Sequence, residues 1–275
     1  MLVDLTMHLP GGRLRALARN PARVQIAWLA YPGTTGVPGM RFRLTDPHLD
    51  PPQTSLPYSE ESIRLREAYW PYAAQGTYAP PGAPPVLTKG HVTFGSLNAF
   101  SEVHDGVLDL WAKVLARVEG SRLRLLAPKG RARERVLSRL SRAGIDAGRV
   151  EFSDRLPHDE YMESFRGVDI GLDTFPANGH TTSLDAFYMG VPVVTLACDR
   201  VIGRGGASVA KNLDLPELVT RTAEEYVEVA VRLARDRERL VRLRVSLREA
   251  MERSAFMDGR RFVRALEDAY RAALG

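Results

Sequence analysis

The chain has 275 residues, of which 44% are hydrophobic and 26% charged, a composition typical of a soluble globular protein with one large or two small domains. No apolar run approaches the roughly 20 residues needed to span a bilayer. The opening residues lack the basic segment of a secretory signal, so we expect a cytoplasmic protein without a membrane segment. The single cysteine, Cys198, excludes an intramolecular disulfide framework and a cysteine-based zinc site.

The net charge of +5 does not by itself predict a nucleic-acid partner. Basic residues are spread along the chain and interleaved with acids, and they form no clustered stripe with aromatic residues between them. We therefore predict no nucleic-acid binding. An anionic small-molecule ligand fits the charge equally well.

The first part of the chain predicts short strands and a connector. Strands are expected at residues 2–5, 24–29 and 42–45, and a short helix at 14–18. The strand at 24–29 runs into a turn-rich loop, residues 30–36, and ligands of open α/β sheets bind at such carboxyl ends. Residues 51–90 are rich in proline and aromatics, and the proline cluster at 80–85 predicts a semi-rigid connector. We place a domain boundary near residue 88, giving domains 1–88 and 89–275.

The rest of the chain alternates strands and helices and then becomes helical. Strands are expected at 92–97, 122–126, 150–152, 168–172 and 191–196, and helices at 104–118, 132–143 and 158–165, with a further helix opening at Thr181. Such alternation predicts a parallel, doubly wound sheet with right-handed crossovers. Residues 221–275 are predicted to be helical, beginning with a capping box at Thr222 and Glu225. Glu238 and Arg242 are expected to pair on a solvated face.

The prediction of function depends on residues 173–192, which join two predicted strands. The loop ends where a helix begins, and a helix N-terminus offers unpaired N–H groups and a positive dipole end to an anion. Thr181 and Thr182 add hydroxyls there, and Asp185, one turn later, can accept hydrogen bonds from sugar hydroxyls. Ordinary helix capping uses the same residue types, and for these residues alone it is the simpler interpretation.

Several stretches together resemble the catalytic region of glycosyltransferase family 41, the protein O-linked N-acetylglucosamine transferase and SPINDLY-like family. The matching motifs are Tyr-Pro-Gly-Thr-Thr-Gly at 31–36, Thr-Phe-Gly-Ser-Leu-Asn at 93–98, Asn-Gly-His-Thr-Thr at 178–182 and Met-Gly-Val-Pro-Val-Val-Thr at 189–195. The segments at 2–8 and 21–30 match as well, so the resemblance runs nearly end to end. The motifs at 31–36 and 178–182, in this order and separation, are specific together, whereas either alone would be weak.

The resemblance implies a GT-B fold, in which two Rossmann-like domains hold a UDP-sugar in the cleft between them without a metal or other cofactor. It implies that His180, Thr181 and Thr182, beside Gly179, hold the donor diphosphate and that Asp185 contacts the ribose. The family's uracil and ribose contact region matches residues 156–161, where Tyr161 would stack on the base and His158 would reach the ribose. The loop at 204–208 would add backbone donors and the Arg204 guanidinium. Ordinary helix-start packing for His158 and Tyr161, and a flexible turn for the loop, remain alternatives.

The chain also departs from the family pattern in three places. Members carry a further N-terminal stretch before the first strand, so the first Rossmann-like domain is expected to be partial, with a late start, a broken gene or a partner chain as the alternatives. Glu102 stands where the family has a lysine that neutralises the leaving diphosphate, and losing such a donor typically costs about 100- to 1000-fold in rate. Ala30 replaces a glycine and would crowd the sugar.

These observations support one leading hypothesis and one alternative. The leading hypothesis is an inverting, metal-independent transfer of a hexose such as N-acetylglucosamine from a UDP-sugar to a protein serine or threonine hydroxyl, with the catalytic base unknown. The alternative is a catalytically impaired nucleotide-sugar-binding or interaction module, which Glu102 and the short N-terminal part favour. A different nucleotide-binding protein is the weaker interpretation, because no Gly-x-Gly-x-x-Gly or phosphate-loop motif follows a strand.

Overall fold

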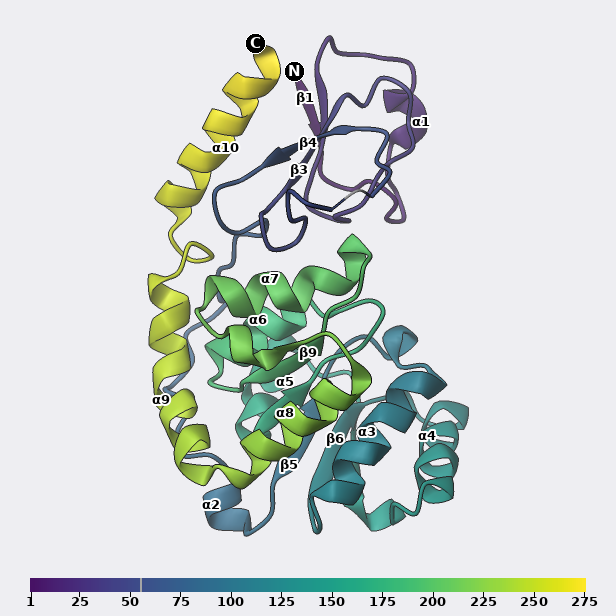
Figure 1. Ribbon diagram of the computed structural model, residues 1–275, viewed down its shortest axis with the longest axis vertical. Helices are drawn as coiled ribbons and strands as arrows, with labels where there is room; N and C mark the ends of the chain where they lie inside the picture. Colours follow the sequence, from purple (N-terminus) through teal and green to yellow (C-terminus); the bar gives the residue numbers. More distant parts are fainter. Residues whose placement is uncertain (55) are drawn as a thin grey trace.

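Across residues 1–54 and 56–275, which the computed structural model describes, the strands form two separate parallel sheets (Figure 1). The first is four-stranded, in the order β1 (Leu2–Asp4), β2 (Gln25–Ala27), β3 (Phe42–Thr45) and β4 (Glu61–Arg64). The short helix α1 (Leu14–Leu17) connects β1 to β2. We call this part the first unit and residues 65–85 the connector.

The second unit contains the larger sheet, with the order β10-β9-β8-β5-β6-β7. Its strands are β5 (Thr93–Ser96), β6 (Arg122–Leu126), β7 (Val150–Ser153), β8 (Ile170–Leu172), β9 (Val193–Leu196) and β10 (Val219–Thr220). Its helices are α2 (Val86–Lys89), α3 (Asp105–Arg117), α4 (Arg131–Arg142), α5 (His158–Ser164), α6 (Thr181–Tyr188), α7 (Gly205–Asn212), α8 (Ala223–Arg235) and α9 (Arg237–Arg253). The crossover order, with β5 beside β8, is that of a doubly wound sheet.

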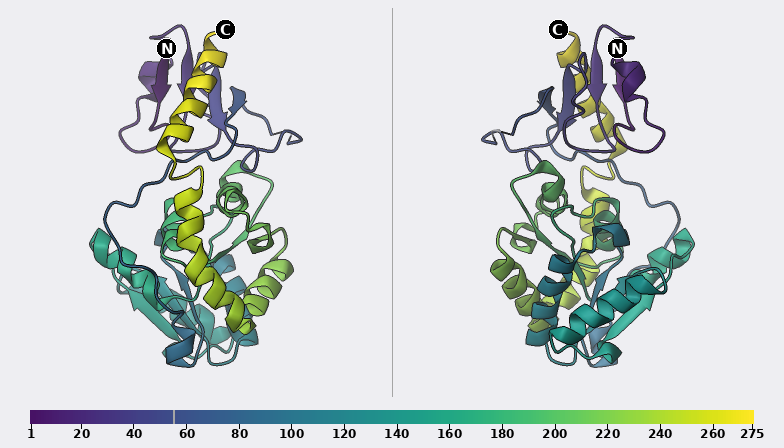
Figure 2. Two further views of the ribbon diagram at one scale, coloured as in Figure 1. Left: turned by 90° about the vertical axis from the view of Figure 1, so that its left-hand side faces the viewer. Right: turned by 90° about the vertical axis from the view of Figure 1, so that its right-hand side faces the viewer.

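Helix α10 (Gly259–Leu274) leaves the second unit and lies along the first, as the side views show (Figure 2). Phe262 stacks on Trp28 with ring centroids 5.9 Å apart, and Arg261 pairs with Glu67. Both rings are buried, so the end of the chain contributes to the core of the first unit. Burying two large aromatic rings favours this arrangement by several kcal/mol at about 25 cal/mol per Å² of apolar surface.

The predicted α/β architecture with GT-B character is confirmed, and most predicted elements agree within one to three residues at their ends. One half of the capping box is confirmed, since Thr222 Oγ1 accepts from the Glu225 N–H at 3.1 Å, but the Glu225 carboxylate accepts from the Arg221 N–H instead of that of Thr222. The Glu238–Arg242 pair is confirmed at 3.6 Å. The domain boundary near residue 88 remains a prediction. No helix within the described residues has the length and apolar character needed to cross a membrane.

Three expectations need correction. The segment treated as a proline- and aromatic-rich region before the connector contains β4, whose sequence, Glu61-Ser-Ile-Arg64, carries a charge at each end and so hides the strand pattern. The short strand β10 was not predicted. The segment 204–208, expected to be a loop, instead contains the start of α7, which begins at Gly205. Gly205 and Gly206 are helical there despite the low helix propensity of glycine.

Candidate functional site

The loop between β8 and α6 is held by a buried carboxylate, Asp173. Its Oδ1 accepts hydrogen bonds from the backbone N–H groups of Thr174 (2.9 Å) and Gly179 (2.8 Å) and from Asn98 Nδ2 (3.1 Å). Its Oδ2 accepts from Thr195 Oγ1 at 2.8 Å. Burial raises the pKa of Asp173 to about 7, while these four donors act in the opposite direction. The network fixes the loop and thereby sets where α6 begins.

Two glycines allow neighbouring segments to approach this loop closely. A Cβ on Gly179 would lie 2.7 Å from Asn98 Oδ1, and one on Gly205 would lie 2.1 Å from Cδ2 of His180. Both contacts are too short for a side chain. The absence of a Cβ at Gly205 lets the start of α7 pack directly on the His180 ring at the start of α6.

A cavity of about 440 Å³ lies where the carboxyl ends of β2 and β8 meet. Its size falls in the range of small-molecule sites. The first unit contributes Leu29 and Ala30, the connector contributes Trp70–Ala73 and Gln75, and the second unit contributes His158, His180, Thr181, Leu184 and Asp185. Ligands of open α/β sheets bind at such carboxyl ends, and here both units and the connector form the walls.

His180 occupies the N-cap position of α6 and stacks on Trp70, with ring centroids 4.2 Å apart and planes inclined by 27°. Its Nε2 atom is buried without a hydrogen-bond partner among the described residues. Burial lowers the pKa of His180 to about 4, so the ring is neutral at pH 7. Because the ring carries no charge, the positive charge at this point is that of the N-terminal end of the α6 dipole, which attracts an anionic ligand.

Asp185 lies one turn into α6 and is buried, with 5% of its surface exposed. Tyr72 of the connector donates its hydroxyl to Oδ1 at 2.8 Å, and Tyr161 of α5 donates to Oδ2 at 3.0 Å. Burial raises the pKa of Asp185, and the two tyrosine hydroxyls oppose that rise. Each carboxylate oxygen keeps acceptor capacity for a further donor, as a ribose hydroxyl would supply.

Of the remaining predicted site residues, Thr181, Thr182 and His158 lie at or beside this cavity, and Arg204 lies elsewhere. Thr181 is exposed at the cavity wall, Thr182 follows it half-buried, and His158 is exposed at the wall with its ring 6.1 Å from that of Tyr161. The structure does not bring Arg204 to this cavity. Its Nη1 donates to Thr54 Oγ1 at 3.3 Å, and its side chain lines a different cavity between the units.

Two residues of this wall were not anticipated from the sequence, Trp70 and Tyr72. Their only sequence signal is the aromatic cluster at 69–72, within the region of residues 51–90 that is rich in proline and aromatics. Trp70 covers His180, and Tyr72 binds Asp185 across 113 positions of the chain.

Glu102 lies close to the same loop rather than on the cavity wall. It ends a short 3₁₀ helix, residues 100–102, and accepts a hydrogen bond from Thr174 Oγ1 at 3.3 Å. The carboxyl is half-buried, and burial raises its pKa. Within residues 1–54 and 56–275, no group of three or more His, Cys, Asp or Glu side chains is placed to hold a metal ion.

The fold and the cavity define a GT-B glycosyltransferase architecture, and solved structures agree. The chain superposes on a sucrose-phosphate synthase from Thermosynechococcus elongatus with a TM-score of 0.60 at 12% identity, a likeness of fold alone. It superposes on a mutant O-GlcNAc transferase from Thermobaculum terrenum with a TM-score of 0.90 at 38% identity, covering 99% of this chain and 52% of that one.

The family follows from the sequence comparisons. The model of glycosyl transferase family 41 matches residues 85–266, and the chain belongs to that family. It is 40% identical to the probable UDP-N-acetylglucosamine–peptide N-acetylglucosaminyltransferase SPINDLY of Petunia hybrida and 38% identical to that of Arabidopsis thaliana. These alignments cover 99% and 98% of this chain and 30% of each relative, so the chain spans less than a third of their length.

Proposed function

We propose that the chain transfers a hexose such as N-acetylglucosamine from a UDP-sugar to a serine or threonine hydroxyl of a protein. The observation that carries the proposal is the cavity at the start of α6, where Asp185 and the helix N-terminus lie together. The peptide N-acetylglucosaminyltransferase names of the relatives support the choice of donor and acceptor.

In this proposal each group of the cavity has a distinct task. The N–H groups at the start of α6, with Thr181 and Thr182, bind the diphosphate beside Gly179 and His180. Asp185 accepts from the ribose hydroxyls, which His158 also reaches, while Tyr161 borders the uracil. Ala30 lies at the wall near the sugar position. The positive end of the helix stabilises the negative charge that develops on the departing UDP, and the transfer inverts the sugar without a metal.

The alternative proposal is a nucleotide-sugar-binding module with impaired catalysis, and Glu102 favours it. A lysine at this position in the family pattern would attract the leaving diphosphate, whereas a carboxyl is neutral at best and repels it when ionised. The raised pKa of Glu102 reduces this repulsion but supplies no cation. Donor binding would then depend on the α6 wall, which this loss leaves in place.

Replacing Glu102 separates the two proposals. We expect Glu102→Lys to raise transfer from UDP-N-acetylglucosamine to an acceptor peptide by about 100- to 1000-fold, because one electrostatic donor to a transition state has that effect. Glu102→Gln, which removes only the charge, is the matched control and should give a smaller gain.

The outcome assigns the chain to one proposal. A wild-type chain that transfers sugar supports the enzyme, and a further gain in Glu102→Lys shows that Glu102 limits its rate. If wild type binds UDP but transfers no sugar, whether or not Glu102→Lys restores transfer, the binding module is correct. If the folded chain binds no uridine nucleotide, both proposals are wrong.

A further inference from the structure

The wall of the cavity at the start of α6, the α6 cavity, contains a residue in a strained conformation. Leu29 has a φ of 85°, in the left-handed region that favours glycine. Of the four non-glycine residues with a positive φ in the described part of the chain, Leu29 is the one that lines this cavity. Such a conformation persists only where the surrounding structure holds it, so the contacts that hold Leu29 are the ones to identify.

Two side chains of the connector hold the backbone of Leu29. Its N–H donates to the Tyr69 hydroxyl at 2.7 Å, and its carbonyl accepts from Trp70 Nε1 at 3.3 Å. Strand β2 ends two residues earlier, at Ala27, so the sheet does not pair these groups. Both polar backbone groups of Leu29 are therefore bound by adjacent side chains that lie about 40 positions further along the chain.

Tyr69 is itself fixed by contacts to both units. Its side chain is buried, its N–H donates to Asp46 Oδ2 at 3.1 Å, and its carbonyl accepts from Trp28 Nε1 at 3.1 Å. The same Asp46 oxygen accepts from Ser208 Oγ of α7 at 2.6 Å, which brings the second unit into the network. Burial raises the pKa of Tyr69, so its hydroxyl is neutral at pH 7 and offers Leu29 an uncharged acceptor at a fixed position.

Trp70 connects the turn at Leu29 to the α6 wall of the cavity. Its Nε1 binds the Leu29 carbonyl, and its ring stacks on His180, the N-cap residue of α6, with centroids 4.2 Å apart. Tyr69 and Trp70 also pack edge to face, with centroids 4.7 Å apart. This aromatic pair therefore sets the spacing between the start of α6 and the turn that leads into Ala30, the next residue on the wall.

We propose that Tyr69 is a positioning residue for the sugar end of the donor. Its hydroxyl holds Leu29 in the left-handed turn, and that turn places Ala30 beside the sugar. The nucleotide end is bound by the α6 wall and Asp185, so loss of the hydroxyl weakens binding of the sugar and not of UDP. The inference rests on the proposed function and deepens it, because Tyr69 acts on the donor without touching it.

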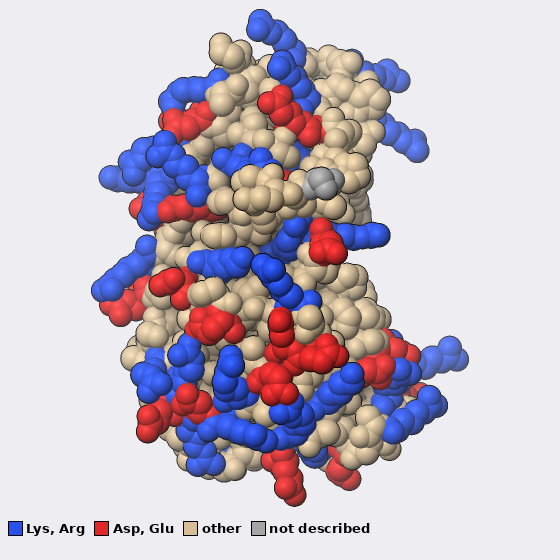
Figure 3. Space-filling view, viewed as in Figure 1, with Lys and Arg blue, Asp and Glu red and all other residues tan. Residues whose placement is uncertain are grey.

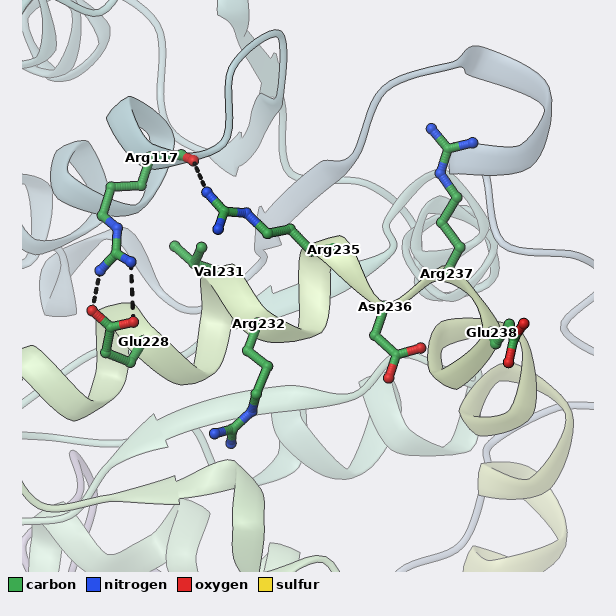
Figure 4. A pocket seen from close by; sticks show the side chains of 8 residues that line it. All are labelled: Arg117, Glu228, Val231, Arg232, Arg235, Asp236, Arg237 and Glu238. Atoms are coloured by element: carbon green, nitrogen blue, oxygen red, sulfur yellow. Dashed lines mark hydrogen bonds and ion pairs between the residues drawn. The ribbon is translucent and has the colours of Figure 1, made fainter.

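Other features of the molecule give the donor no comparable guidance. On the face shown in Figure 3, Lys and Arg side chains are interspersed with Asp and Glu on both units, so this face presents no broad surface of one sign to an anionic ligand. The groove of Figure 4, of about 600 Å³, is lined by charged side chains, of which Arg117 pairs with Glu228. None of its lining residues, all within the described part of the chain, has a positive φ.

The first measurement is calorimetric titration of the full chain with UDP and with UDP-N-acetylglucosamine, which gives the ratio of the two affinities. We expect Tyr69→Phe to bind UDP within about twofold of wild type and the nucleotide sugar at least about fivefold more weakly, since a buried N–H left without its acceptor has an effect of that size. Tyr58→Phe is the matched control, because its hydroxyl donates to Asp50 at 3.3 Å and not to Leu29. It should keep the wild-type ratio.

Glycine at position 29 tests whether the Tyr69 hydroxyl acts through the backbone conformation. Glycine adopts a positive φ without strain, so Tyr69→Phe/Leu29→Gly should recover the wild-type ratio. Tyr69→Phe/Leu29→Ala lacks the same leucine side chain but keeps the Cβ, and it should not recover the ratio. As single variants, Leu29→Gly should unfold at a higher temperature than Leu29→Ala, which reverses the usual order of glycine and alanine.

Hydrogen exchange of residues 28–33 in the unliganded chain is a readout that needs no nucleotide. Tyr69→Phe should speed exchange of the Leu29 amide at least about fivefold, and Tyr58→Phe should not. Unchanged exchange in Tyr69→Phe overturns the inference. If UDP binds but Tyr69→Phe leaves the ratio unchanged, or weakens both ligands equally, the inference alone is overturned. A folded wild-type chain that binds no UDP contradicts the proposed function, and the role of Tyr69 towards the sugar is then rejected with it.

Discussion

The loop around Asp173 and the cavity wall around Asp185 are neighbours in sequence, yet their buried carboxylates are satisfied differently. The four donors to Asp173 come from the loop itself, from Asn98 just after β5 and from Thr195 of β9, all in the second unit. The two donors to Asp185 come from the connector and α5, and the carboxylate borders a cavity. The first arrangement holds the fold, whereas the second keeps acceptor capacity facing a space that a ligand can enter.

The largest effect is expected at Asp173. Asp173→Ala leaves two backbone N–H groups and two side-chain donors without an acceptor, at about 1–3 kcal/mol for each buried group left unpaired. We expect the free energy of unfolding, measured by urea denaturation, to fall by about 3 kcal/mol or more, and UDP binding to fall with it. Asp173→Asn keeps part of the acceptor set and should lose less. A fully stable Asp173→Ala chain would contradict a structural role.

The pH dependence of stability tests the environment of His180. Its pKa is about 4 in the folded chain and about 6.5 when unfolded, so between these values the unfolded state binds the extra proton. The stability contributed by the neutral ring is therefore complete above pH 6.5 and is lost as the pH falls towards 4, by at most about 1.4 kcal/mol per pH unit.

His180→Asn removes this titration and serves as the reference. The difference in unfolding free energy between wild type and His180→Asn should shrink as the pH is lowered from 7 to about 4.5. Parallel pH profiles for the two chains would mean that the ring is not excluded from water beside Trp70.

A smaller effect is expected from Tyr72→Phe, which removes one hydroxyl from Asp185. Losing one hydrogen bond costs about 1 kcal/mol, and we expect UDP affinity to fall about fivefold because Asp185 is less firmly positioned. Tyr78→Phe is the matched control, since the Tyr78 hydroxyl donates to Asp159 at 2.9 Å and not to Asp185. Equal losses of UDP affinity in both variants would contradict the inference that the Tyr72 hydroxyl positions Asp185 for binding.

The sequence predicts the local parts of this site and not its long-range contacts. The strand, the turn and the helix beginning at Thr181 follow from hydrophobic pattern, turn residues and the family motif, all within about twenty positions. The contact of Tyr72 with Asp185 depends on how the connector crosses between the units, which no local pattern encodes.

Two other features show the same limit. The helical pattern at 259–274 predicts a helix but not that Phe262 reaches back to Trp28 of the first unit. The sequence predicts that Arg204 belongs to the donor site. In the structure Arg204 ends a turn of 3₁₀ helix before α7, and its guanidinium lies at Thr54 instead of His180. In each case the packing of one unit against the other decides the outcome.

The most direct test of the account is calorimetric titration of the full chain with UDP, for wild type and for Asp185→Ala, after circular dichroism has shown that both are folded. We expect wild type to bind UDP saturably and Asp185→Ala to bind it at least about tenfold more weakly, because a charge-assisted hydrogen bond to the ribose is lost. A folded wild-type chain that binds no UDP, or an Asp185→Ala chain that binds it equally well, would contradict the assignment of the α6 cavity as the donor site.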